Sequence, residues 1–557
     1  MRWFGGCAPG GRQAVPVGAR LLWSRPALWI TGTWPVHPAR VAVGRSTRLA
    51  VLGTCSASER DLDHALTAPD LTEAVGEWAG SFIAVRLTQR NVVEVLTDPA
   101  GACPLYTVTT PDGLVWGSSS RALSGLAGGD VDDDWLASYL WDTKAPVPGR
   151  SAWANVAPVP AGHRLLLSAE AVHSSPWWSP AKRRPAEALP AIRRALSEGV
   201  RVRVKDVETS TDLGGMDSTT LAVIAAQHRP ITALTAHPSA VAEGGDLQYA
   251  RALDVPGLSR IEFPLEDHHL PFSPAEAPLP AVDEPPPSNA VWAMLSAQLR
   301  ITAATGATRH LTGDGGDDLF LPSPRHLVDL ARSRRWLRLV SDAMAWAQLR
   351  RQDPRPLIAA ALRGDMEGIA RPWLTRPPWL TSSVPTPTAQ AGDADSALIS
   401  SVRTAARTAH ADGQLANTVG VELHNPYFDG AVLDAVVSVP SHLRFSAHRY
   451  KPLLVDACGD LLPEPHRRRT TKGVFTADFH RGVRANLPRI LDLADGHLAA
   501  RGLIDPAPLR ATVHAAALGA ETIWASLLPT LAAEQWLAAI ERTPAIRWQT
   551  TAPAGSR

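Results

Sequence analysis

The sequence predicts two domains, a β-rich N-terminal domain followed by an α/β domain with many helices. At 557 residues the chain is too long for one hydrophobic core. Up to about residue 180 it contains short alternating or apolar runs separated by Gly, Pro and Asp, a pattern typical of strands and turns. After residue 190, strand-like runs alternate with helical segments, which favours an α/β arrangement.

Composition narrows the class of protein. The chain is 45% hydrophobic and 20% charged with a formal net charge of +1, an ordinary globular balance that gives no strong field for nucleic acid. No apolar run reaches the roughly 18 residues that a membrane-spanning helix needs. The start, MRWFGGCAPGG, lacks the apolar core and the cleavage site of a signal peptide. We therefore expect a cytoplasmic protein that binds neither nucleic acid nor a membrane.

The boundary between the domains is predicted at residues 174–190, SSPWWSPAKRRPAEALP, where Pro and Arg accumulate. The two domains would then span residues 1–180 and 190–557. The four cysteines are scattered and show no CxxC or Cys/His ligand spacing. This argues against a structural zinc site and against a disulfide framework.

The most informative segment of the second domain is KDVETSTDLGGMDSTT, in which a short β-like run ends at Gly214 and Gly215 before an apolar helix. A glycine pair at such a turn lets the backbone approach a phosphate, and the helix start offers free N–H groups and the positive end of the helix dipole. Asp217, Ser218 and Thr219 fall in the first helical turn. The hydroxyls there can donate to phosphate oxygens and the carboxylate can bind Mg²⁺.

A second acidic turn, HLTGDGGDDLF, follows at residues 310–320 and places Asp314, Asp317 and Asp318 among three glycines. An EF-hand would need a Glu at the twelfth loop position, and none stands there. Two glycine-rich acidic turns in one α/β domain together favour a site for phosphate and a divalent cation.

GGMDS and TGDGGDDLF resemble SGGxDS and SGEGADELF, the pyrophosphate-binding pair of the asparagine synthetase B family. Within that family the chain most resembles the lasso peptide cyclases, which form macrolactams, and the resemblance runs from about residue 76 to about residue 480. It implies an α+β, N-terminal-nucleophile-like β-sandwich domain followed by an α/β ATP-pyrophosphatase domain with many helices. Leu213 departs from the pattern because it stands where the family has the first Ser, and Ser210 or Thr211 are candidates to supply that hydroxyl.

The resemblance also implies ATP and Mg²⁺ as cofactors, with Asp217 and Asp317 as the metal ligands. The residues that it assigns to ATP binding are Leu213, Gly214, Gly215, Asp217, Ser218, Thr219, Gly313 and Lys451. HRYKPLLVDAC resembles the family's K-Y-I-L-R-E-A segment, which puts Lys451 at a lysine that contacts phosphate. RRRTTKGVF resembles the R-x-K-x-G-F loop and puts Lys472 where the charge of the acyl-adenylate is neutralised. The chain holds only five Lys against fifty Arg, so a retained Lys favours a need for a compact point charge.

GSFIAVRL, VLTDPAGACPLY and VWGSSSRAL resemble the glutaminase-like domain of the same family. An active glutaminase of this type uses a Cys directly after the initiator Met, because its own α-amine then acts as the base. Arg2 stands at that position, and Cys7 is the nearest thiol. We therefore expect this domain to be inactive as a glutaminase.

In the lactam-forming relatives a pair of residues deprotonates the attacking amine. The resemblance puts Asp314 at the first position of that pair. His410 falls near the second by spacing, upstream of VELHNPYFDG, and is the candidate partner. In VELHNPYFDG, Asp429 is interpreted as a structural residue that anchors a helix.

The resemblance predicts a lasso-type macrolactam synthetase that adenylates an Asp or Glu side chain of a core peptide and joins it to the N-terminal α-amine. It implies a precursor peptide, a leader-recognition protein and a leader peptidase as partners. One alternative is a small-molecule ligase that uses free ammonia or closes a β-lactam. The other is a non-catalytic nucleotide-binding homologue, for which Leu213 is the main support.

Overall fold

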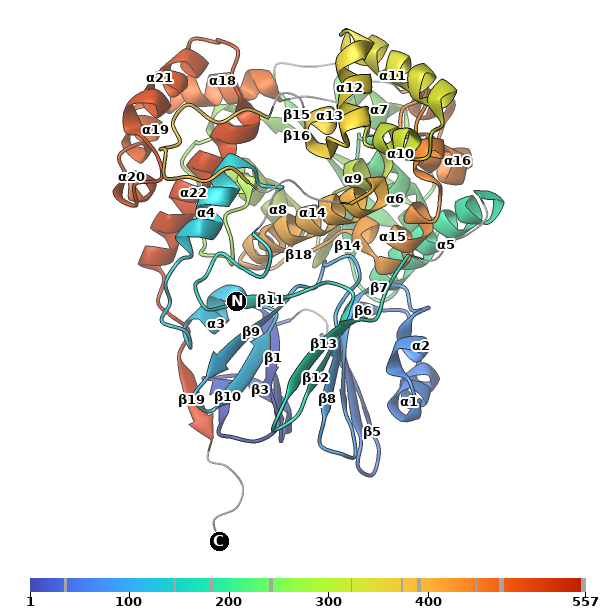
Figure 1. The fold of residues 1–557 in the computed structure, drawn as a ribbon, viewed down its shortest axis with the longest axis vertical. Helices are drawn as coiled ribbons and strands as arrows, with labels where there is room; N and C mark the ends of the chain where they lie inside the picture. Colours follow the sequence, from blue (N-terminus) through green and yellow to red (C-terminus); the bar gives the residue numbers. More distant parts are fainter. Residues whose placement is uncertain are drawn as a thin grey trace.

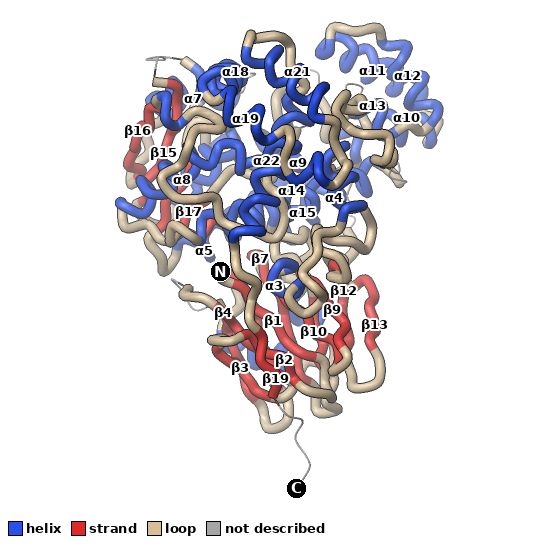
Figure 2. Tube along the Cα trace, turned by 90° about the vertical axis from the view of Figure 1, so that its left-hand side faces the viewer, coloured by secondary structure: helices blue, strands red, loops and turns tan. Residues whose placement is uncertain are grey.

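The computed structural model describes residues 1–551 except 35–37, 145–146, 181–184, 240–243, 322, 372–373, 388–391, 447 and 470–474. It shows a mixed α/β protein with many helices (Figure 1), as the sequence predicts. The strands of the N-terminal region gather at the lower end of the molecule, and most helices lie at the upper end together with strands such as β15 and β16, which a view turned by 90° also shows (Figure 2).

The N-terminal domain is built from two six-stranded antiparallel sheets. The first has the order β11 (Ala157–Val159), β9 (Leu105–Thr110), β10 (Gly113–Gly117), β1 (Trp3–Cys7), β4 (Ala27–Thr31), β3 (Arg20–Ser24). The second has the order β13 (Val172–Pro176), β12 (His163–Leu167), β8 (Val93–Leu96), β7 (Gly80–Leu87), β6 (Arg48–Cys55), β5 (Ala39–Val43).

The central strands of the second sheet are apolar on both faces because both faces are covered. One face of β6 and β7 joins a cluster that includes Phe4 and Trp116 of the first sheet. The other face packs on α1 (Glu59–Thr67) and α2 (Leu71–Val75) through residues such as Leu62. Alternate residues of one strand thus serve two separate cores.

The second domain contains a five-stranded parallel sheet. Its order is β16 (Leu258–Leu265), β15 (Ile231–Pro238), β14 (Thr209–Asp212), β17 (Arg309–Leu311), β18 (Glu422–His424). The chain moves outward in one direction from β14 to β16 and then returns to place β17 on the other side of β14. In open α/β sheets ligands bind at the carboxyl ends of the strands where the order reverses, and here that point lies between β14 and β17.

Helices cover the parallel sheet, and further helices lie above it in Figure 1. Those nearest the sheet are α5 (Pro185–Val204), α6 (Met216–Ala226), α7 (Gly245–Ala252), α8 (Trp292–Ala304), α9 (Gly316–Phe320), α14 (Ala394–Asn417), α15 (Gly430–Val437), α16 (Pro452–Cys458) and α17 (Glu464–Arg467). A helical insertion projects at the outer end and has a small core of its own; it consists of α10 (His326–Arg332), α11 (Trp336–Arg350), α12 (Pro354–Arg363) and α13 (Met366–Ala370).

The C-terminal helices pack on α3 (Ser120–Ser124) and α4 (Asp133–Trp141) of the N-terminal region in one shared core. They are α18 (Thr476–Ala485), α19 (Leu487–Leu493), α20 (His497–Ala500), α21 (Pro506–Ala517) and α22 (Trp524–Arg542). The chain then returns to the N-terminal domain, where β19 (Trp548–Thr551) pairs with β2 (Gln13–Pro16). None of the helices in the described part of the chain is both long enough and apolar enough to cross a membrane.

Two sequence-based expectations need correction. The predicted linker 174–190 is shorter, because β13 continues to Pro176 and α5 already begins at Pro185. Residues 371–390 contain many helix breakers and suggest a surface loop, but Trp379 within them is fully buried and its indole N–H donates to Thr530 Oγ1 at 3.0 Å. A buried indole needs such an acceptor.

Candidate active site

The two glycine-rich turns lie side by side at the predicted point of strand reversal. The first leaves β14 through Gly214 and Gly215 and enters α6, and the second leaves β17 and enters α9. Because β14 and β17 are neighbouring parallel strands, their carboxyl ends meet at one edge of the sheet. Asp217 and Asp317, each in the first turn of its helix, are thereby brought together.

Glycine is required where the two turns touch. A Cβ added at Gly316 would lie 2.4 Å from Cγ of Asp217, and one at Gly313 would lie 3.0 Å from the backbone nitrogen of Ser218. Gly214 has a φ of +134°, and a Cβ there would lie 2.7 Å from Cβ of Asp246. The glycines therefore allow the two turns and α7 to pack closely against one another.

Lys451 connects the two acidic side chains. Its Nζ lies 2.5 Å from Asp317 Oδ1 and also forms an ion pair with Asp217 Oδ2. The lysine is 0% exposed and occupies the N-cap of α16 with a left-handed φ of 45°. A non-glycine residue held in this conformation stores strain, which clusters at functional sites.

The hydroxyls around the first turn have separate roles. Gly214 N–H donates to Thr219 Oγ1 at 3.4 Å, and Ser218 Oγ donates to the Gly215 carbonyl at 3.3 Å. Ser210 Oγ bonds His310 Nδ1 at 2.8 Å, and Thr211 Oγ1 donates to the Leu311 carbonyl at 3.1 Å. The last two hydroxyls thus hold β14 to β17, which does not support the expectation that either one replaces the missing motif serine.

Leu213, which stands at the position of that serine, is 4% exposed and joins the core of the second domain. Its N–H donates to the Leu234 carbonyl at 2.8 Å, and its carbonyl accepts from Thr235 Oγ1 at 2.9 Å. Its backbone is therefore fixed in the turn, while its side chain supplies no group for a phosphate.

Arg469 is a site residue that the sequence did not single out. Its guanidinium donates to the Gly214 carbonyl, forms an ion pair with Asp246, and lies 4.3 Å from the centre of the Tyr249 ring. The arginine is 4% exposed. Arg469 thereby holds the first glycine turn in place. In the sequence, only the basic run RRRTTK pointed to a functional role for this arginine. Lys472, in the same run, lies outside the described residues.

Asp314 and Asp412 form a second acidic pair. Asp314 is exposed, and its Oδ2 accepts from Thr312 Oγ1 at 2.8 Å and from Asn425 Nδ2 at 3.3 Å. Burial raises the pKa of the Asp412 carboxyl to about 8, and the charge of Asp314 is the second cause. A hydrogen bond with the Ser288 side chain lowers this pKa and offsets part of the increase. Asp412 Oδ1 is buried and has no hydrogen-bond partner among the described residues. It was not among the residues that the sequence singled out.

His410 lies two residues earlier on α14 and has other neighbours. Its Nε2 is 3.2 Å from Gln414 Nε2 and 3.8 Å from Asp283 Oδ2. It lines a cavity between the domains together with Arg2 and Asn425. Because an α-helix turns about 100° per residue, Asp412 and His410 point in different directions, and it is the pKa of Asp412 that the charge of Asp314 raises.

Arg2, at the position of the glutaminase nucleophile, contacts the second domain. Arg2 Nη1 donates to Asn417 Oδ1 at 2.7 Å and lies 3.7 Å from Glu422 Oε1, so the residue at the nucleophile position connects β1 to the second domain. Burial raises the pKa of the Cys7 thiol to about 12, and its Sγ donates to the Ala14 carbonyl. A buried thiol of this kind is unreactive.

Asp429 has the structural role that the sequence suggested. It is 0% exposed and accepts from Arg203 Nη2 at 2.6 Å and from Ser81 Oγ of β7 at 2.7 Å. A buried ion pair thus joins the two domains at the start of α15.

The two carboxylates fit a magnesium ion whose other ligands are the phosphate oxygens of a nucleotide. No cluster of three or more His, Cys, Asp or Glu side chains that could hold a metal occurs in the part of the chain that the structure describes. Mg²⁺ is commonly bound by one or two carboxylates together with phosphate oxygens, and Asp217 and Asp317 supply two. The strand-to-helix turn and Lys451 supply donors for the phosphates.

The parallel sheet, the paired glycine turns and the acid–lysine cluster together have the form of a phosphate-binding α/β domain. A family model for asparagine synthase matches residues 191–538, more than half of the chain, so the protein belongs to the asparagine synthase family. This is a family of ATP-dependent ligases that form amide bonds and generally use ATP and Mg²⁺. The specific reaction is not given by this match.

Other comparisons add little. No curated protein matches the sequence. Among solved structures, the glutamine phosphoribosylpyrophosphate amidotransferase from B. subtilis complexed with ADP and GMP is 11% identical, with 56% of this chain and 82% of that chain covered and a TM-score of 0.22. A structure of the allosteric regulatory enzyme of purine biosynthesis gives the same identity and TM-score over 56% and 74% of the two chains.

Proposed function

We propose that the protein is an ATP-dependent macrolactam synthetase of the lasso peptide type. It adenylates the side-chain carboxylate of an Asp or Glu in a core peptide and joins it to the N-terminal α-amine as an isopeptide bond, releasing AMP and pyrophosphate. The observation that carries this proposal is Asp412, whose buried Oδ1 has no partner in the described structure and whose pKa is raised by burial and by the charge of Asp314 in the second acidic turn.

Mg²⁺-bound ATP supplies the electrophilic α-phosphorus and the pyrophosphate leaving group. The Gly214–Gly215 turn and Lys451 would bind the phosphates, and Asp217 and Asp317 would hold the metal ion, which would neutralise phosphate charge. The protein's part in this step is to align the carboxylate oxygen with phosphorus and to stabilise the charge that develops on the leaving group.

The second step needs a base, because an α-amine attacks only after it has lost its proton. A carboxyl with a pKa of about 8 matches such an amine, whose ordinary pKa is about 7.7–8.0. The amine nitrogen attacks the acyl carbon, the bond to AMP breaks, and the proton passes to Asp412. The negative charge of Asp314, which also accepts from Asn425, favours this protonation of Asp412.

The nitrogen source is expected to be the substrate's own amine. Arg2 occupies the position of the glutaminase nucleophile and is tied to Asn417 and Glu422, so the N-terminal domain offers no route to ammonia from glutamine. A precursor peptide is therefore the expected partner, with a leader-recognition protein and a leader peptidase acting before ring closure.

Pyrophosphate release from Mg²⁺-ATP tests the proposal. The purified protein is assayed with glutamine plus aspartate, with ammonium plus aspartate, and with linear peptides that have a free N-terminus and an internal Asp or Glu. We expect pyrophosphate release with the peptides and not with either aspartate mixture. Release with ammonium and aspartate, and none with peptide, identifies a small-molecule ligase instead. No release in any mixture, with the partner proteins also supplied, identifies a non-catalytic homologue.

A further inference from the structure

A cavity of about 760 Å³ adjoins Asp317 and Asp318 and has no part in the chemistry described above. It lies between the helical insertion and the elements α9, α14 and α16, and Tyr450, next to Lys451, also lines it. A group bound there is in direct continuity with the acidic end of the phosphate site, because Asp317 belongs to both.

One wall of this cavity is a stack of rings. The Trp346 and Phe445 rings lie 4.9 Å apart at 17°, and the Phe445 and His326 rings lie 5.2 Å apart at 28°. His326 is fixed by Asp342 Oδ2 at 3.1 Å and by the Ser323 carbonyl at 2.9 Å. The stack is therefore held in place from behind and presents ring edges and faces to the cavity.

Aliphatic side chains contribute much of the remaining lining. They include Leu319, Leu321, Leu374, Leu398 and Leu453. The indole Nε1–H of Trp346 is buried and has no acceptor among the residues that the structure describes. The Nε–H of Arg325, another lining residue, likewise has no acceptor among them. The cavity thus combines largely apolar walls with polar donors that lack a partner in the described structure, a combination that suits an apolar ligand carrying a carbonyl group.

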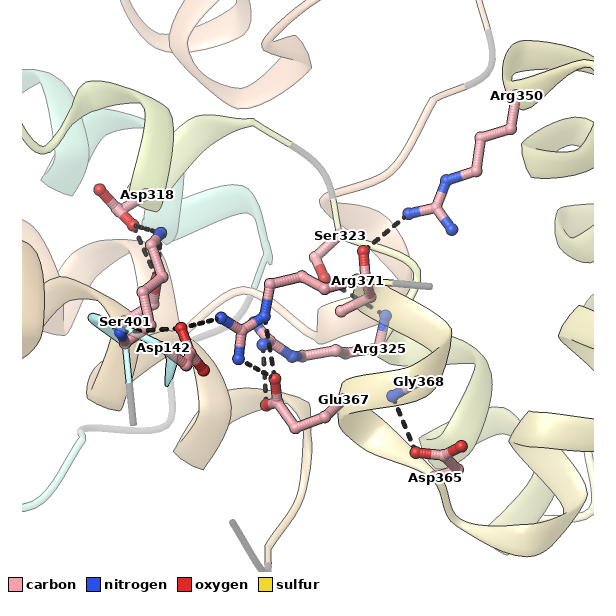
Figure 3. A network of polar contacts seen from close by, with 12 residues as sticks. Asp142, Asp318, Ser323, Arg325, Arg350, Asp365, Glu367, Gly368, Arg371 and Ser401 are labelled. Carbon is pink, nitrogen blue, oxygen red and sulfur yellow. Dashed lines mark hydrogen bonds and ion pairs between the residues drawn. The ribbon is translucent and has the colours of Figure 1, made fainter. Parts of the chain in front are cut away.

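The charged residues of the lining are paired with one another, as Figure 3 shows. Arg371 Nη1 bonds Asp142 Oδ1 at 2.6 Å, and Arg325 Nη2 bonds Glu367 Oε1 at 2.9 Å. Asp318 accepts from Ser401 Oγ at 2.7 Å.

Other cations of the lining are used in the same way. Lys144 Nζ lies 3.0 Å from Asp318 Oδ1, and Arg350 donates to the carbonyls of Ile369 and Ala370. Because these charges are satisfied within the wall, binding there is expected to depend on apolar contact rather than on ion pairing.

We propose that this cavity binds an apolar, aromatic-containing segment of the peptide whose carboxylate is activated. The inference rests on the proposed function and names its substrate class. Sites of about 300–1,000 Å³ hold drug-sized ligands, so a cavity of this size accommodates several side chains, whereas a free amino acid and ammonia leave it unused. The helical insertion that forms its outer wall is then the specificity element of the enzyme.

A direct binding measurement tests this without ATP. The probes are two fluorescent linear peptides with a free N-terminus and Gln in place of the reactive Glu, one with a Leu-, Phe- and Trp-containing tail and one with a Ser/Gly tail. We expect the apolar peptide to bind at least tenfold more tightly by fluorescence anisotropy. Equal affinity for both peptides overturns the proposal.

Variants locate the site. Phe445→Leu and Trp346→Phe keep most of the packing and are expected to weaken binding of the apolar peptide severalfold, with Phe445→Ala stronger in effect. Leu337→Ala is the matched control, because Leu337 lies on the same insertion but is 92% exposed and does not line the cavity. Thermal unfolding confirms that each variant is folded. Unchanged affinity in folded Phe445→Leu and Trp346→Phe proteins overturns the assignment.

Failure of this inference is distinguishable from failure of the proposed function. Apolar-peptide binding that Phe445→Leu weakens, without any ring closure, supports the cavity assignment and counts against the synthetase proposal. The opposite outcome is ring closure with a KM for the peptide that changes neither with the tail composition nor in these variants. That outcome supports the synthetase proposal and overturns the cavity assignment.

Discussion

Lys451 Nζ lies 2.5 Å from Asp317 Oδ1 and also contacts Asp217, so one buried ammonium group joins the two acidic turns of the site. The residue sits in a left-handed backbone conformation before Pro452, which aims its side chain into the cleft. The ammonium therefore holds the turns in register, at the same two carboxylates that fit a magnesium ion.

Lys451→Met is expected to lower pyrophosphate release by at least about 100-fold, because it removes a preorganised cation from the phosphate site. It also leaves the partly exposed Asp217 and Asp317 without the cation that lies between them, so the free energy of unfolding is expected to fall as well. Lys205→Met, at an exposed lysine, is the control and should change neither quantity. An active Lys451→Met protein would show that the lysine is only structural.

The rate of ring closure is expected to rise with pH up to about 8. Burial and the charge of Asp314 raise the pKa of Asp412, so the carboxyl is largely protonated at pH 7 and becomes a base only as pH approaches 8. The Asp412→Asn variant should close the ring about 10²–10⁴-fold more slowly, and its rate should no longer rise with pH in this range. Single-turnover rates from pH 6 to 9 measure it, with His410→Asn compared in parallel. A pH limb that is lost in His410→Asn and kept in Asp412→Asn would assign the base to the histidine.

The same substitution is expected to stabilise the protein at alkaline pH. The folded pKa of about 8 lies above the ordinary value of 3.8, so between these values the folded state binds more protons and its stability falls as pH rises. Asp412→Asn removes that loss, so the difference in Tm between variant and parent should grow from pH 4 to pH 8. A constant difference would mean that the carboxyl titrates normally.

Asp429→Asn should destabilise the protein by about 3–5 kcal/mol, because Arg203 remains buried opposite a neutral group. The expected effect on KM for ATP is small, since Asp429 joins the domains and does not reach the phosphate turns. Asp460→Asn is the control, because Asp460 pairs with Arg193 at the surface, where such a pair contributes about 0–1 kcal/mol. Chemical denaturation measures both variants.

The parts of the site that could be predicted from sequence are those encoded locally. Gly214, Gly215 and Asp217 lie within a few residues of one another, and a strand-to-helix turn fixes their geometry without reference to the remainder of the chain. The pairing of β14 with β17 then brings in Asp317. The mixed α/β character follows from the same periodicities.

The rest depends on tertiary packing that sequence spacing does not encode. Asp412 differs from His410 by two positions, but the rotation of α14 decides which of them faces Asp314. Arg469 donates to the Gly214 carbonyl although the two residues are 255 positions apart in the sequence. Trp379 sits among helix breakers that suggest a surface loop, and only the C-terminal helices that cover it explain its burial.

Transfer of an isotopic label tests the central claim most directly. A linear peptide with oxygen-18 in its single Asp or Glu side chain is incubated with Mg²⁺-ATP and the enzyme, and both products are analysed by mass spectrometry. Adenylation followed by amine attack predicts AMP carrying one oxygen-18 atom and a peptide lighter by one labelled water. Unlabelled AMP, ADP as the nucleotide product, or a peptide of unchanged mass would contradict it.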